Sequence, residues 1–130
     1  MIVAAMISVL AGGIIVALDP GARINMSRDG VRKSDLRQIQ SALEMYRSDL
    51  GAYPASITCN STLVSGGVTY MQKAPCDPIG TAESYLYTPV GTPPTGYTLR
   101  ACLQTGGDLD ADQPSVGCPV GRYSLTVRNP

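Results

Sequence analysis

The sequence contains no histidine, no tryptophan and no phenylalanine among its 130 residues. Histidine is the side chain most often used as a general base near neutral pH and as a metal ligand. Its absence excludes nucleophilic triads of the Ser-His and Cys-His kinds. The densest carboxylate group, Asp108, Asp110 and Asp112, has no evident nucleophile or base as a partner. Since catalysis needs such a convergent pair, we expect that the protein is not an enzyme.

Charge is also scarce, because only 15% of the residues are Asp, Glu, Lys or Arg. Ten basic residues balance ten acidic residues, so the formal net charge is zero. A neutral chain has no global attraction for nucleic acid, and no nucleic-acid partner is predicted. The length of 130 residues allows one globular domain of ordinary size.

The N-terminal segment from Met1 to Leu18 has no charge, no Asn, no Gln and a single hydroxyl, Ser8. A helix of this length is about 27 Å long, close to the roughly 30 Å hydrocarbon core of a membrane. The alternatives are a cleaved signal peptide, whose basic start and cleavage site are not clear here, and a buried core helix. We predict a helix that lies in a membrane or in the core of a filament. Its filament-core side chains are predicted to be Ile2, Val3, Met6, Val9, Leu10, Ile14, Ile15 and Leu18.

A basic segment follows the apolar run and contains Arg23, Arg28, Arg32, Lys33 and Arg37. The positive-inside rule would place this flank in the cytoplasm. The four cysteines instead indicate an oxidising compartment. The conflict eases if a basic leader precedes Met1 and has been removed. Two interpretations of the basic residues stay open: a solvated helix face, or ion pairs with acidic residues of neighbouring subunits.

Asp19-Pro20-Gly21 interrupts the apolar run, since Pro inside a helix bends or ends it. An amphipathic helix is then predicted from about residue 22 to 50, with Gly51 as a stop signal. Its apolar residues recur every three to five positions, as on one helical face. They are Val31, Leu36, Ile39, Leu43, Tyr46 and Leu50. We divide the chain into an apolar helix, residues 1–21, and a head, residues 22–130.

The head is predicted to combine this helix with loops and three short strands. Residues 51 to 83 are rich in Gly and Pro turn signals, which rarely continue helices or strands. Apolar and polar residues then alternate over 84–88, 97–103 and 122–127, which predicts an antiparallel sheet with one apolar face. The predicted fold class is α+β: a long N-terminal helix, apolar in its first half and amphipathic in its second, packed on a small antiparallel sheet.

Four cysteines lie in the head, and an even number in a loop-rich domain predicts two disulfides. The spacing favours pairs that are neighbours in the sequence, Cys59 with Cys76 and Cys102 with Cys118. Four cysteines allow three pairings, and the sequence does not choose firmly among them. The rival interpretation, a four-thiolate zinc site, lacks the C-x₂-C spacing that such sites use.

Two segments carry the pattern of a known family. Residues 28–54, RDGVRKSDLRQIQSALEMYRSDLGAYP, resemble the helix and following turn of bacterial type IV pilins and type II secretion major pseudopilins. Residues 75–99, PCDPIGTAESYLYTPVGTPPTGYTL, resemble the segment that leads into the pseudopilin sheet. The resemblance implies a lollipop-shaped subunit of a cell-surface filament. Its apolar helix would lie in the inner membrane before assembly, and its partners would be identical subunits in a helical homopolymer and the assembly machinery.

The N-terminal region departs from the family pattern, which has a basic leader and a Glu at the fifth mature position. This chain shows no such leader and has Ala at position 5. We expect that it begins several residues inside the usual mature N-terminus. The alternative is a subunit that lacks the Glu.

No cofactor is required by the sequence, but the resemblance implies a calcium ion before the C-terminus. Asp108, Asp110 and Asp112 follow two glycines and resemble the start of a calcium loop, because calcium binds several oxygens. The spacing is not that of an EF-hand, since the sixth and twelfth positions are not Gly and Glu. The alternative is a solvated acidic turn.

The leading functional hypothesis is a structural subunit of a type IV pilus or type II secretion pseudopilus. The alternative is a membrane-anchored extracytoplasmic binding domain that does not polymerise. A simple anchor needs only hydrophobicity, so the amphipathic continuation from residue 22 to 50 favours the filament subunit.

Overall fold

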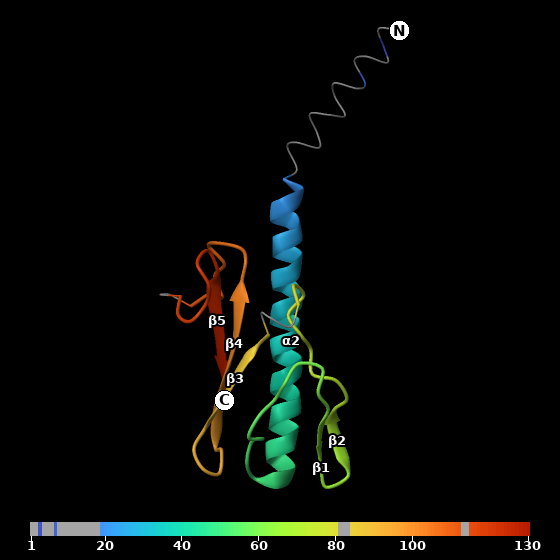
Figure 1. Cartoon of the computed structure of the whole chain (residues 1–130), viewed down its shortest axis with the longest axis vertical. Helices are drawn as coiled ribbons and strands as arrows, with labels where there is room; N and C mark the ends of the chain where they lie inside the picture. Colours follow the sequence, from blue (N-terminus) through green and yellow to red (C-terminus); the bar gives the residue numbers. More distant parts are fainter. Residues whose placement is uncertain (1–2, 4–6, 8–18, 81–83, 113–114) are drawn as a thin grey trace.

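The structure is a computed structural model that describes residues 3, 7, 19–80, 84–112 and 115–130. Helix α2 spans Pro20–Leu50 and forms the axis of the head (Figure 1). Asp19 caps its start: the backbone is left-handed there, with φ 38°, and the carboxylate accepts a hydrogen bond from the Ala22 N–H at 3.4 Å. Pro20 is tolerated in the first turn because no N–H is needed there, so the helix begins slightly before residue 22.

The end of α2 is as predicted. Gly51 adopts the left-handed conformation at φ 77°, and its N–H donates to the Arg47 carbonyl at 2.7 Å. Glycine meets no Cβ penalty in that conformation, which is why it terminates helices so often.

Three antiparallel strands form the main sheet in the order β3-β4-β5: β3 is Leu86–Val90, β4 is Gly96–Leu103 and β5 is Tyr123–Arg128. The central strand β4 places Leu99 opposite Tyr87 on one side and opposite Val127 on the other. Alternate residues of β4 are buried, in agreement with the alternation in the sequence. The predicted α+β class is therefore confirmed.

A second, two-stranded sheet contradicts the prediction that residues 51–83 are loops. Strand β1, Leu63–Ser65, pairs antiparallel with β2, Val68–Met71, on the side of α2 away from the main sheet (Figure 1). Gly66 and Gly67 join them with φ of 56° and 80°. Two residues with positive φ give the tight turn that suits a twisted hairpin. The Gly-Gly pair is thus a hairpin turn inside a sheet.

The hydrophobic core lies between α2 and the two sheets. Leu36, Ile39 and Leu43 of α2 are at most 2% exposed. The rest of the core is contributed by the sheets and the loops beside them: Tyr53, Leu63, Met71, Ala74, Tyr97, Leu99, Ala101, Leu103 and Leu125, with Ala42 on the helix.

The apolar stripe predicted on the helix includes residues that do not pack into the core. Val31 and Leu50 are 45% and 46% exposed, so their assignment to the packed face is wrong. The two sheets lie beside the middle and the C-terminal half of α2, and the first turns of the helix project beyond them (Figure 1). Periodicity alone cannot show where this cover ends.

The predicted apolar helix of residues 1–21 lies mostly outside the described residues. Of the predicted filament-core side chains, only Val3 is described, and it is helical and 70% exposed. Among residues 3, 7, 19–80, 84–112 and 115–130, no helix has the length and apolar character needed to cross a membrane.

Candidate functional site

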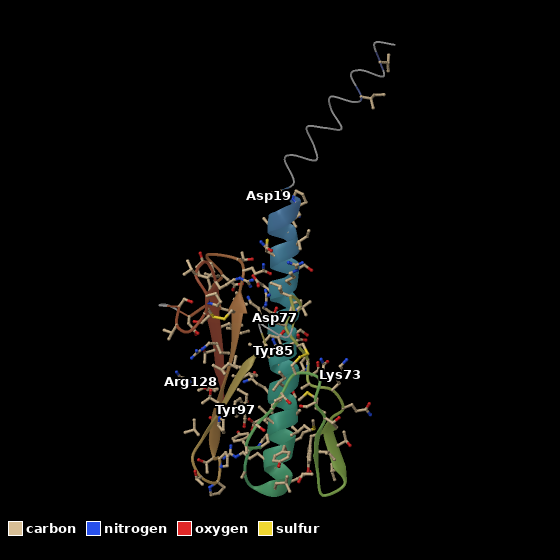
Figure 2. The ribbon with its side chains drawn as sticks, in the orientation of Figure 1. Asp19, Lys73, Asp77, Tyr85, Tyr97 and Arg128 are labelled. Atoms are coloured by element: carbon tan, nitrogen blue, oxygen red, sulfur yellow. A yellow bond between two sulfur atoms is a disulfide. The ribbon has the colours of Figure 1, made fainter. Side chains whose placement is uncertain are left out.

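A buried guanidinium group fastens α2 to the head. The Arg32 side chain has no exposed surface. Its Nε and Nη2 atoms donate to the two carboxylate oxygens of Asp77 at 2.6 and 2.9 Å. Its Nη1 atom donates to Asp29 at 2.7 Å and to the Gln104 amide oxygen at 3.2 Å. Asp77, which is labelled in Figure 2, lies in the loop before β3, and Gln104 follows β4. The Arg32 side chain therefore joins the helix to two distant parts of the chain.

Asp29 completes the cluster from one turn earlier on α2. Its carboxylate accepts the Gln104 N–H at 2.9 Å and the Thr105 N–H at 2.8 Å. Burial disfavours the charged carboxylate, but these donors and Arg32 outweigh it and lower the pKa of Asp29. Burial likewise disfavours the charged Arg32, and its hydrogen bonds to Asp77 and Asp29 raise its pKa. Asp29 and Arg32 are therefore both held in their ionised forms.

Both interpretations of the basic segment are wrong for Arg32 and Lys33. Arg32 is buried rather than solvated, and its ion-pair partners belong to its own head. Lys33 also binds acidic residues of its own chain, Asp108 and Asp110. The i,i+3 spacing of Asp29 and Arg32 is the signal in the sequence for this pairing. Asp77 carries no comparable signal, since it is distant in the chain.

Lys33 holds the loop between β4 and β5. Its ammonium lies 2.7 Å from Asp108 Oδ1 and 2.6 Å from Asp110 Oδ2. Asp112 is bound elsewhere: its carboxylate accepts the Thr126 hydroxyl at 2.7 Å, and its N–H donates to the Ser124 carbonyl at 2.7 Å. In the described part of the chain, no group of three or more acidic, His or Cys side chains is arranged to hold a metal ion. The three carboxylates predicted to bind calcium therefore do not converge.

The cysteines form the two favoured disulfides. Cys59 is bonded to Cys76 and Cys102 to Cys118, with Cα–Cα distances of 5.0 and 5.7 Å. The first closes the segment that contains the β1–β2 hairpin and ends one residue before Asp77. The second joins β4 to the loop that carries the acidic residues. Both disulfides thus restrain loops that also form ion pairs with charged side chains of α2.

Tyrosine hydroxyls provide further links between the helix and the sheet. Tyr85 donates to Asp35 at 2.6 Å, and Tyr53 donates to Glu44 at 2.8 Å. Tyr97 packs edge-on against Tyr53, with ring centroids 4.8 Å apart. Burial, opposed by a Gln40 hydrogen bond and reinforced by the charge of Glu44, raises the pKa of Tyr97 to about 12. The alternation in the sequence identified Tyr85 and Tyr97 as residues of an apolar strand face, but it did not identify the hydrogen-bond partners of the tyrosine hydroxyls.

The charged and polar clusters thus connect α2 to the disulfide-linked sheets and loops of the head. This arrangement is suited to holding α2 rigidly. No protein-family profile matches the sequence, and no solved structure matches it. The chain is similar to the type II secretion system core protein G of Pseudomonas aeruginosa, with 31% identity over an alignment 124 positions long; the match covers 86% of each chain. The helix-and-sheet fold agrees with the resemblance carried by residues 28–54 and 75–99. The chain belongs to the pilin and pseudopilin family of type II secretion core protein G.

Proposed function

We propose that the protein is the structural subunit of an extracellular helical filament, a type II secretion pseudopilus or a type IV pilus, and that it polymerises through its apolar N-terminal helix. The observation that carries the proposal is the position of the apolar run. Residues 1–18 directly precede α2, whose first turns project beyond the sheets (Figure 1). An apolar helix without cover in its own head must be covered by lipid or by other subunits.

The side chains near this junction support association with other subunits. Ile24 and Met26 on the projecting turns of α2 are 52% and 60% exposed. Gly12 and Gly13 in the apolar run would let helices approach closely in a bundle. Before assembly, the same helix would anchor the subunit in the inner membrane, with the head outside the cytoplasm, where both disulfides are stable. The pilus or secretion assembly machinery would then extract it.

The rigid attachment of α2 supports a structural rather than an enzymatic role. A filament transmits force from its core helices to its heads, so each helix must not turn or slide within its head. Arg32 supplies that restraint through buried, charge-assisted hydrogen bonds to Asp77, and Asp29 through bonds from the backbone after β4.

Electron cryo-microscopy of material sheared from cells that express the full-length gene tests this function. We expect thin filaments in which residues 1–18 form a central bundle, and we expect Ile14→Glu to abolish them. The matched control is Val90→Glu, which adds the same charge at a side chain of the head that is 53% exposed. If the wild-type protein occurs only as isolated membrane subunits, polymerisation is refuted and an anchored binding domain becomes the better explanation.

A further inference from the structure

We propose that the Lys33 ammonium is the resident cation of the acidic loop, residues 106–112, so that this loop closes onto α2 without calcium. The ammonium bonds to one carboxylate oxygen of Asp108 and one of Asp110, at 2.7 and 2.6 Å. These are two of the three carboxylates whose spacing resembles a calcium loop. The proposal does not depend on whether the subunit polymerises.

The position of Lys33 is determined by its neighbour on the helix. Arg32 is buried and bonded to Asp77 before β3 and to Gln104 after β4, which restricts the rotation of α2 about its axis. The next residue, Lys33, then points toward the loop that follows β4. Its side chain is only 19% exposed, and that of Asp108 is 16% exposed. The ion pair is therefore partly shielded from water and salt.

The loop is also organised around the ammonium. The Asp110 N–H donates to Asp108 Oδ1 at 3.0 Å, so the oxygen that binds Lys33 also shapes the turn. Hydrogen bonds from Lys33 and from the Asp110 backbone lower the pKa of Asp108, and bonds to both carboxylates raise the pKa of Lys33. Asp108 and Lys33 are thus both charged near neutral pH.

A calcium ion does not fit this arrangement. Calcium requires six to eight oxygens at about 2.3–2.6 Å. The Lys33 ammonium already lies 2.7 Å from Asp108 Oδ1 and 2.6 Å from Asp110 Oδ2. It therefore excludes a second cation from the space between these two carboxylates. Asp112 is tied to β5 through Thr126 and Ser124, so its carboxylate does not join the other two. Calcium binding would require Lys33 to leave and Asp112 to be released.

The first test measures calcium directly on the full-length protein in detergent micelles. We expect the same thermal unfolding midpoint in excess EGTA and in excess calcium, and no saturable heat of calcium binding by isothermal titration calorimetry. A midpoint that rises with calcium, together with saturable binding, would overturn the proposal.

The second test asks whether the Lys33 charge itself closes the loop. Lys33→Met should lower the midpoint by roughly 2–5 °C, because it leaves two carboxylates without their cation. Lys73→Met is the matched control, since Lys73 is an exposed lysine on the hairpin side of α2 (Figure 2). Asp108→Asn should cost less in the Lys33→Met background than in the wild type. If the two substitutions are additive, or if Lys33→Met behaves like the control, Lys33 is not the cation of this loop.

Discussion

The Arg32 guanidinium donates two parallel hydrogen bonds to the carboxylate of Asp77, which lies 45 residues away in the sequence. This geometry uses the fork of the guanidinium and both oxygens of the carboxylate, which is the most specific form of an ion pair. The pair is fully enclosed, so its integrity depends on both partners. It holds this turn of α2 against the loop before β3.

Replacing Arg32 with Met should destabilise the head severely. The substitution leaves the buried carboxylates of Asp29 and Asp77 without their cation, which costs about 3–5 kcal/mol of unfolding free energy. Urea denaturation of the full-length protein in detergent measures the loss. Arg37→Met is the control, because Arg37 is exposed on the same helix and should change stability by less than about 0.5 kcal/mol. Equal losses for the two variants would contradict the assigned role of Arg32.

Acid should destabilise the protein through Asp29. The folded state lowers the pKa of this carboxyl below its ordinary value of 3.8. Its contribution to stability is therefore complete above that value and is lost as the pH falls through the lower, folded pKa. We expect the unfolding free energy to drop below about pH 4, and to drop less steeply in Asp29→Asn, which is already destabilised at neutral pH. Parallel pH profiles for the two proteins would show that Asp29 does not carry the effect.

High pH should destabilise the protein through Tyr97. Its pKa is raised from 10.0 to about 12, so its contribution to stability is complete below pH 10 and is lost as the pH rises through 12. Phenolate absorbance should show a tyrosine that titrates late and that is missing in Tyr97→Phe. The variant should also lose less stability than the wild type between these pH values. Simultaneous titration of all tyrosines at ordinary pH in the folded protein would refute this prediction.

Each disulfide should stabilise the head by closing a loop. The bonded cysteines are separated by 17 and 16 positions, and loops near that length contribute about 3 kcal/mol in the chain-entropy account. We expect that Cys59→Ala/Cys76→Ala and Cys102→Ala/Cys118→Ala each lower the unfolding free energy by about that amount. Peptide mapping under non-reducing conditions checks the pairing, and peptides that link Cys76 to Cys102 would contradict it.

Much of the head could be predicted from local patterns. The periodic stripe around Leu36, Ile39 and Leu43 identified the helix, and alternation identified β3, β4 and β5 to within about two residues. The β1–β2 hairpin was missed because its strands are only three and four residues long and flank a Gly-Gly pair that also occurs in loops. The cysteine spacing favoured the correct pairs without excluding the others.

For the charged site, less could be predicted from the sequence than for the helix and the strands. The sequence alone determined that an apolar segment precedes an amphipathic helix, that four cysteines lie in the head and that catalysis by histidine is excluded, because composition and short-range periodicity decide these features. Only the tertiary structure decided that Arg32 is buried in an ion pair with Asp77. The same holds for the ion pairs of Lys33 with Asp108 and Asp110. Those pairs join residues 45 to 77 positions apart, and nothing local marks a basic residue as solvated or enclosed. Their partners follow from how the sheet and its loops pack against the helix.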